Sequence, residues 1–101
     1  MPEFSTPFNG CNYVRKLNKD ELIRAIRFSI AAEFEAVQLY EQLRDSIDDK
    51  KSAELLNEIA DDEKIHAGNF LYLLKQLSPN DEKLYNDGEK EAVEVINDSA
   101  E

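Results

Sequence analysis

Fifty consecutive residues without a proline or a glycine, residues 18–67, are the feature that most constrains the fold of this chain. Within them apolar side chains recur every three or four residues, which is the spacing of one face of an α-helix. The polar run at residues 48–51 interrupts this pattern and divides it into two helices, each of roughly 28 residues and about 42 Å long. Because so short a connection makes the helices antiparallel neighbours, the sequence predicts an all-α hairpin over residues 18–78.

The beginnings and ends of the two helices carry signals of their own. Asn18 precedes Glu21 by three residues, the pattern of a capping box. Either aspartate of the 48–51 run can cap the second helix. The second helix should stop near Ser78 and Pro79, because proline disfavours helical backbone at the residue before it. These signals support the helix boundaries inferred from the apolar pattern.

The two ends of the chain are less regular. Residues 1–17 hold two of the three prolines and several aromatic side chains; we interpret them as an irregular N-terminal arm that either docks on a neighbouring surface or stays disordered. Residues 79–101 are expected to form a short C-terminal helix capped by Ser78 and an acidic tail. Residues 89–97 form a further weak helix beyond Gly88 in this interpretation.

Composition excludes several classes of protein. The chain has 101 residues, enough for one small domain, and its 22 acidic against 12 basic side chains give a net charge of −10. This charge argues against nucleic acid or an anionic membrane as partner and fits a surface that attracts cations. No apolar stretch is long enough to span a membrane, and no basic segment followed by an apolar run predicts a signal peptide. The single Cys11 cannot form an internal disulfide, which favours a cytoplasmic location.

Ionisable residues interrupt both apolar stripes at positions where a core side chain belongs. Glu33 stands within the first stripe, and Glu63 and His66 stand within the second. Burying a carboxylate is costly unless it is paired, protonated or bound to a metal. Folding the hairpin about residue 49 places Glu33 opposite position 65, so the three residues lie at one level and predict a metal site.

Glu63 and His66 form an E-x-x-H motif, which by itself is weak in a chain with many glutamates. In di-iron carboxylate bundles, a Glu from each of two helices combines with an E-x-x-H from each of the other two. This chain holds half of that set, so a two-fold dimer of hairpins would supply the whole. Its four carboxylates balance the charge of two Fe(II) ions, and carboxylate with imidazole suits iron or manganese. The plainer alternative is that Glu63 belongs to the solvated run 61–64 and that His66 is a partly exposed surface histidine.

Other residues have weaker claims to a role. Glu35 points well away from the face that carries Glu33, so solvated surface is its default. Tyr40 lies two turns from Glu33 on the same face, where core packing outweighs a redox role. Four apolar residues lie off the main stripes and suggest a second interface that joins dimers into a ring: Phe28, Phe34, Leu55 and Tyr72.

Two segments, EFEAVQLY at residues 33–40 and DDEKIHA at residues 61–67, resemble the encapsulated ferritins, which are ferritin-like proteins associated with encapsulin shells. The resemblance covers roughly residues 18–96. It implies a ferroxidase that oxidises Fe(II) with dioxygen: a hairpin that dimerises into a ferritin-like four-helix bundle, with two iron ions at each dimer interface. It further implies that the homodimers form an annular decamer and that mineral for iron storage or detoxification collects inside an encapsulin nanocompartment in the cytoplasm.

Position by position, the resemblance implies that Glu33, Glu63 and His66 are the catalytic iron ligands. It places Glu35 in a secondary metal site and Tyr40 beside the iron centre. Ala32 and Leu39 depart from the family, some members of which carry an acid and a tryptophan there.

Residues 94–101 hold no evident basic, apolar shell-targeting peptide. This leaves open a truncated chain, a chain fused to its shell, or a docking signal of another kind.

Two alternative functions stay open from the sequence. One is a di-iron protein of the rubrerythrin type that consumes peroxide, although the Cys-rich rubredoxin module that usually supplies its electrons is not found in this sequence. The other is a non-enzymatic helical-hairpin interaction module, in which Glu33, Glu63 and His66 are incidental.

Overall fold

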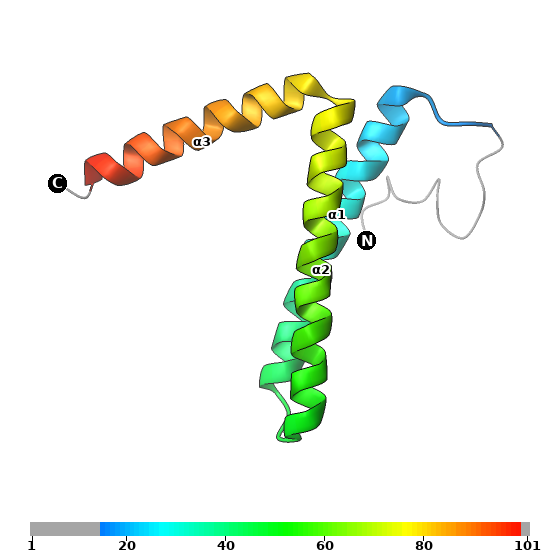
Figure 1. The fold of residues 1–101 in the computed structure, drawn as a ribbon, viewed down its shortest axis with the longest axis vertical. Coiled ribbons are helices and arrows are strands. Elements are labelled where there is room, and N and C mark those ends of the chain that lie inside the picture. The colour runs from blue at the N-terminus through cyan, green and yellow to red at the C-terminus, as the bar shows by residue number, and fades with distance from the viewer. Residues whose placement is uncertain (1–14, 100–101) are drawn as a thin grey trace.

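The computed structural model describes residues 15–99, and all the regular structure in this range is helical (Figure 1). It comprises α1 (Lys19–Asp45), α2 (Lys50–Leu77) and α3 (Pro79–Ser99). Helices α1 and α2 lie side by side as an antiparallel hairpin, and α3 leaves the end of α2 and runs away from it. The predicted all-α hairpin is therefore confirmed, while most of the predicted N-terminal arm lies outside the described residues.

The helix starts follow the predicted signals. The side chain of Asn18 accepts a hydrogen bond from the backbone N–H of Glu21, and the Glu21 carboxylate accepts one from the backbone N–H of Asn18, each at 2.9 Å. Arg15 also donates to Glu21, and these bonds lower the pKa of the Glu21 carboxyl to about 2. At the start of α2, the side chain of Asp49 accepts from the backbone N–H of Lys51. Both predicted caps are confirmed.

The core between α1 and α2 is narrow. Ile26 and Ile30 of α1 pack with Leu74 of α2 near the end of the hairpin where α1 begins. Further along the hairpin the buried residues of α2 are small, because Ala60 and Ala67 are 0% and 3% exposed. Small side chains let two helices approach closely, and these alanines lie one turn before and one turn after Glu63. The two helices therefore approach each other closely around Glu63, where the metal site was predicted.

Many large apolar side chains of the hairpin stay exposed. The exposed fraction is 53% for Phe34, 58% for Leu55 and 66% for Tyr72, three of the residues expected to form a second interface. Leu39 and Ile65 are similarly exposed. Large exposed apolar areas are unusual on a monomer and mark interaction surfaces. The second interface expected at Phe34, Leu55 and Tyr72 remains a prediction.

Helix α3 differs from its expected form, because it is one continuous helix of 21 residues that runs through Gly88. A glycine inside a helix costs only about 0.5–1 kcal/mol relative to alanine. Good helix formers follow Gly88, and the Nζ atom of Lys83 lies 3.2 Å from a carboxylate oxygen of Asp87 one turn later. A cost of this size is too small to break a helix that continues on both sides, so the expected short segments merge.

A buried carboxylate joins α3 to the hairpin. Asp81, which is 8% exposed, accepts hydrogen bonds from Arg27 of α1, from the Ser78 hydroxyl and from the Tyr85 hydroxyl. Arg27 contributes through both Nε and Nη2, at 2.9 to 3.2 Å. The hydrogen bonds from Arg27 and then Ser78 lower the pKa of the Asp81 carboxyl. We call these four residues the junction cluster; it fixes the first turn of α3 against α1.

Candidate metal centre

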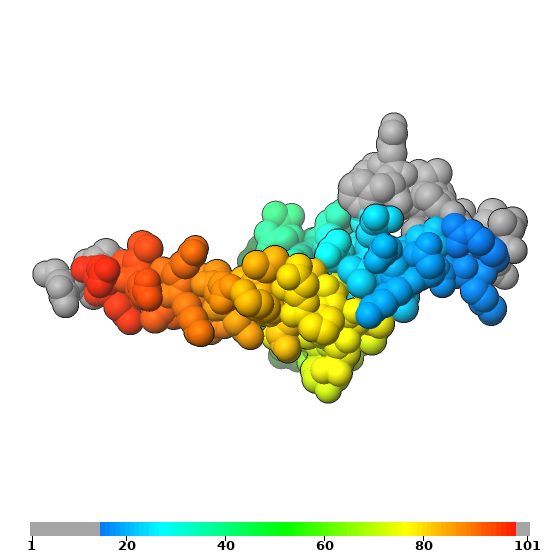
Figure 2. Space-filling model, turned by 90° about the horizontal axis from the view of Figure 1, so that it is seen from above, coloured from blue at the N-terminus to red at the C-terminus, as the bar shows by residue number. Residues whose placement is uncertain are grey.

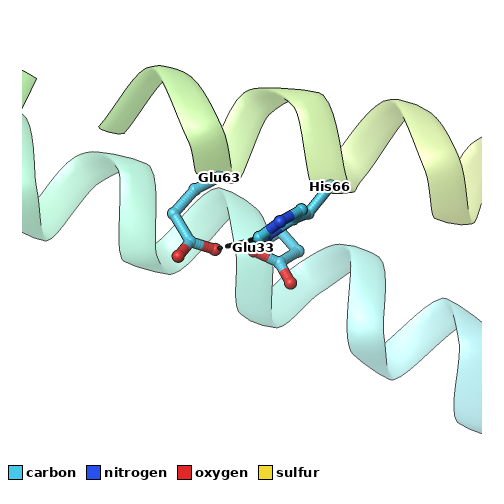
Figure 3. Close-up of side chains that lie close together, drawn as sticks. All are labelled: Glu33, Glu63 and His66. Atoms are coloured by element: carbon cyan, nitrogen blue, oxygen red, sulfur yellow. Dashed lines mark ion pairs between the residues drawn. The ribbon is translucent and has the colours of Figure 1, made fainter. Parts of the chain in front are cut away.

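The hairpin positions three potential metal ligands from two helices. On α1, Glu33 lies between the buried Ile30 and Val37, about one turn from each. On α2, Glu63 and His66 occupy the face that turns toward α1, and their spacing of three residues places them side by side. Figure 3 shows the three side chains pointing toward one another between the helices. The hairpin arithmetic that placed Glu33 at the level of this motif is therefore correct.

The distances define a compact cluster. The Nδ1 atom of His66 lies 3.6 Å from Oε2 of Glu63 and 3.9 Å from Oε2 of Glu33 (Figure 3). One ligand atom from each of the three residues lies within 4.8 Å of the others. Such separations are too long for hydrogen bonds but suit atoms that surround a common ion. We call Glu33, Glu63 and His66 the ligand cluster.

Burial within the ligand cluster is uneven. The side chains of Glu33 and Glu63 are 17% and 21% exposed, whereas that of His66 is 52% exposed. Oxygen Oε2 of Glu33 is fully buried and has no hydrogen-bond partner within residues 15–99. An unsatisfied buried carboxylate oxygen is costly, and a bound cation would remove that cost. The cluster is thus closed on the hairpin side and open on the side of His66.

The nearest lysine in the sequence does not neutralise these carboxylates. Lys64 directly follows Glu63, but its Nζ atom lies 2.9 Å from Glu41 of α1 and 3.7 Å from Asp61. The hydrogen bond to Glu41 raises the pKa of the Lys64 ammonium group. Across the described part of the chain, His66 is the one basic side chain within 4 Å of the Glu33 or Glu63 carboxylate.

The donor set has the chemistry that iron needs. Two carboxylates and one imidazole, with no thiolate, suit Fe(II) or Mn(II), and the orphaned Glu33 oxygen offers a place for positive charge. One chain supplies three ligand residues, half of the set of four carboxylates and two histidines found in di-iron bundles. The cluster of one chain thus holds half of such a set and is open on one side.

The two secondary residues lie differently. Glu35 is exposed and lines a depression on the outer side of α1 together with Ala32 and Leu39, so it does not belong to the ligand cluster. Tyr40 is partly buried on α1. The junction cluster was missed at the sequence level, although Asp81 three residues after Ser78 carries the signal of a helix start; nothing in the sequence pairs Asp81 with Arg27.

Comparisons with known proteins agree with the helical-hairpin fold. A family model described as Rubrerythrin matches residues 25–99. The crystal structure of an encapsulated ferritin domain from Pyrococcus furiosus superposes with a TM-score of 0.81 and 32% sequence identity, covering 85% of this chain and 88% of that one. Together the fold and the ligand cluster define a ferritin-like hairpin.

Two curated relatives narrow this class. A ferritin-like–encapsulin shell fusion protein of Pyrococcus furiosus is 37% identical over 68 residues. The encapsulin nanocompartment cargo protein EncC of Myxococcus xanthus is 35% identical over 79 residues. These matches cover 67% and 78% of this chain but only 20% and 59% of the relatives' lengths. The chain belongs to the rubrerythrin family, and within it to the encapsulated ferritins, as the sequence resemblance indicated.

Proposed function

We propose that this protein is a ferroxidase, which oxidises Fe(II) to Fe(III) with dioxygen at a di-iron centre built by two copies of the chain. The observation that carries the proposal is the ligand cluster, with its buried, unsatisfied Glu33 oxygen, on an E-x-x-H hairpin of this family. Fe(II) is the substrate, and one copy of the cluster serves one iron ion.

Each residue of the ligand cluster has a distinct part in this proposal. Glu63, which shares the E-x-x-H motif with His66, would supply the carboxylate that bridges two iron ions. Glu33 holds an ion from the closed side of the cluster, and His66 holds it from the exposed side. Two such clusters bring four carboxylates to two Fe(II) ions, so the buried charges cancel.

Dioxygen accepts the electrons that iron supplies. A pair of Fe(II) ions provides two electrons, and with two protons these reduce one dioxygen molecule to hydrogen peroxide, leaving two Fe(III) ions. The protein's part is to hold both ions at one place and to neutralise their charge with carboxylates. Glu35 and Tyr40 belong to this proposal as a secondary metal site and as a neighbour of the centre.

Assembly and location complete the proposal. The exposed apolar residues of the hairpin would be covered in a homodimer with four-helix bundle form, and dimers would close into an annular decamer. The relatives named as encapsulin cargo and shell fusion support delivery into an encapsulin nanocompartment in the cytoplasm, where oxidised iron is stored.

The direct test is aerobic Fe(II) oxidation by the purified chain, followed by absorbance. The wild type should oxidise iron faster than buffer, with a fast phase that saturates near one iron per chain. Glu63→Gln removes one charge from the ligand cluster, and the matched control Glu54→Gln removes one from an exposed site two to three turns earlier on α2. Only Glu63→Gln should abolish the fast phase; equal rates in both variants would contradict the proposal.

The name of the matching family model favours a second candidate, a di-iron protein that consumes hydrogen peroxide. The same assay distinguishes the two when peroxide replaces dioxygen under anaerobic conditions. A ferroxidase oxidises Fe(II) rapidly with dioxygen. A chain that reacts rapidly with peroxide and slowly with dioxygen would instead be of the rubrerythrin type.

A further inference from the structure

Around the ligand cluster, the core between α1 and α2 is thin. The α2 side chains buried there are Ala60 and Ala67, and an alanine removes little apolar surface from water. Within residues 15–99 no third helix lies along this part of the hairpin, since α3 leaves it as a separate projection (Figure 2). The close approach of α1 and α2 at this level therefore needs support from other side chains.

The ligand cluster itself opposes this close approach. Glu33 and Glu63 face each other from the two helices, and their like charges repel when no cation lies between them. Ligand atoms of the cluster lie within 4.8 Å of one another. Metal–ligand distances in proteins are defined to within about 0.2 Å, so even a small widening of the hairpin weakens the binding of an ion.

An ion pair joins α1 and α2 next to the ligand cluster. The Nζ atom of Lys64, the residue after Glu63, lies 2.9 Å from Oε2 of Glu41 on α1. Asp61 lies further from the same Nζ atom, at 3.7 Å, and belongs to α2 itself, so it does not join the helices. The side chains of Lys64 and Glu41 are 54% and 30% exposed, so either can be replaced without opening the core. We call Lys64 and Glu41 the cross-helix pair.

The cross-helix pair lies on the other side of the helix contact from the ligand cluster. Glu41 comes eight residues after Glu33 and lies about 80° further round α1. Lys64 lies about 100° further round α2 than Glu63. Since the helices are antiparallel, both turns lead to the same side of the hairpin. The fully buried Ala60 lies between, about 60° round α2 from Glu63, so the pair attracts α2 toward α1 without reaching the open side of the ligand cluster.

We propose that Lys64 and Glu41 are positioning residues, whose ion pair holds α1 and α2 at the separation at which the ligand cluster binds iron. The inference rests on the proposed iron site and adds how the metal-free hairpin keeps its ligands together. Attraction on one side of the helix contact offsets repulsion on the other. Because the ammonium group lies between Glu41 and Asp61, it does this without neutralising the ligand carboxylates.

Co(II) binding by the full chain tests this role, because Co(II) takes the same kinds of ligand as Fe(II) and undergoes no turnover. Glu41→Gln and Lys64→Met each break the pair but change the net charge in opposite directions. Each should raise the Co(II) dissociation constant about three- to fivefold, the range of an exposed ion pair. The double variant should bind no more weakly than either single variant. Lys64→Arg keeps the ion pair and should bind like wild type.

A purely electrostatic effect of the two charges predicts another pattern. Lys64→Met would then strengthen Co(II) binding, Glu41→Gln would weaken it, and the double variant would bind like wild type. The matched control Asp61→Asn removes the same charge as Glu41→Gln from beside the same lysine and leaves the cross-helix pair in place. It should change the dissociation constant by less than about 1.5-fold. The electrostatic pattern, equal weakening by Asp61→Asn, or unchanged binding in every variant would overturn the proposal.

Titrations followed by visible absorption should use a chain concentration at which sedimentation gives all variants the same oligomeric state. All variants should also keep the wild-type helix content, which separates positioning from loss of the fold. A wild-type chain that binds no Co(II) and oxidises no Fe(II) would contradict both this proposal and the ferroxidase proposal. A wild type that binds Co(II) no better than Glu41→Gln and Lys64→Met would contradict the positioning role alone.

Discussion

The chain holds two partly buried carboxylate clusters between its helices, and they differ in how their oxygens are satisfied. In the junction cluster, Asp81 accepts hydrogen bonds from Arg27, Ser78 and Tyr85. In the ligand cluster, Glu33 has a buried oxygen with no partner in the described chain, and its contact with His66 is 3.9 Å long. A carboxylate with every donor in place holds structure, whereas one left without donors is poised for a cation.

The largest expected effect is on the rate of Fe(II) oxidation, which should depend on the ligand cluster and not on the junction cluster. Glu33→Gln should lower the rate of the fast phase of Fe(II) oxidation at least about 100-fold, because it removes a ligand charge rather than a supporting contact. Asp81→Asn should leave that rate within about twofold, since the junction cluster lies outside the metal centre. Stopped-flow absorbance of both variants makes the comparison, and a loss of rate in Asp81→Asn equal to that in Glu33→Gln would break it.

Metal should affect association through only one of the clusters. In the proposed dimer, carboxylates of two ligand clusters repel one another until cations bind between them. Fe(II) under anaerobic conditions should therefore lower the dissociation constant of the dimer by on the order of 10-fold or more, measured by sedimentation equilibrium. Glu63→Gln should lose this dependence on metal, and a wild-type dimer indifferent to chelator would count against an interfacial centre.

The two substitutions should affect thermal stability in the opposite order to their effects on iron oxidation. Asp81→Asn removes the acceptor charge of a satisfied network and leaves the Arg27 guanidinium without its partner, so the thermal midpoint should fall by several degrees. Glu33→Gln in metal-free protein should hold or raise the midpoint, because the orphaned oxygen contributes no hydrogen bond to the fold. Circular dichroism of the two variants at equal concentration checks this reversal, which fails if Glu33→Gln is the more destabilised.

The smallest expected effect is a dependence on pH. Since Arg27 and Ser78 lower the pKa of the Asp81 carboxyl below its ordinary value of 3.8, Asp81 contributes its full stabilisation above that value. It loses this contribution as the pH falls through the lowered pKa, where the folded protein binds the proton. The difference in urea midpoint between wild type and Asp81→Asn should stay constant from pH 7 to about pH 4 and shrink below it. A difference that disappears already above pH 5 would contradict the assignment.

Most of the hairpin could be predicted from local signals. The capping box of Asn18 and Glu21 and the cap at Asp49 are interactions between residues two or three positions apart, so their pattern is visible in the sequence. The position of Glu33 opposite Glu63 and His66 could be predicted from the short connection. Both helices rise by the same distance per residue, so residues equally far from the loop lie opposite one another. Such features need no knowledge of distant contacts.

Contacts beyond the hairpin could not be predicted from local sequence patterns. Arg27 and Asp81 are 54 residues apart, and their pairing depends on the angle between α2 and α3, which no local pattern encodes. The continuity of α3 through Gly88 was not predicted, because the glycine was interpreted as the end of a helix, whereas it only lowers the stability of one. The roles of Glu33, Glu63 and His66 remain predictions, since they depend on an ion and on a second chain.

One measurement tests most directly whether the ligand clusters of two chains hold a pair of iron ions. Wild-type protein loaded anaerobically with one ⁵⁷Fe(II) per chain, then exposed to dioxygen and frozen, is examined by Mössbauer spectroscopy. Two ferric ions bridged by carboxylates couple magnetically, so the account predicts a quadrupole doublet without magnetic splitting at low temperature, absent in Glu63→Gln. A spectrum of isolated, paramagnetic Fe(III), or the same spectrum in both proteins, would contradict it.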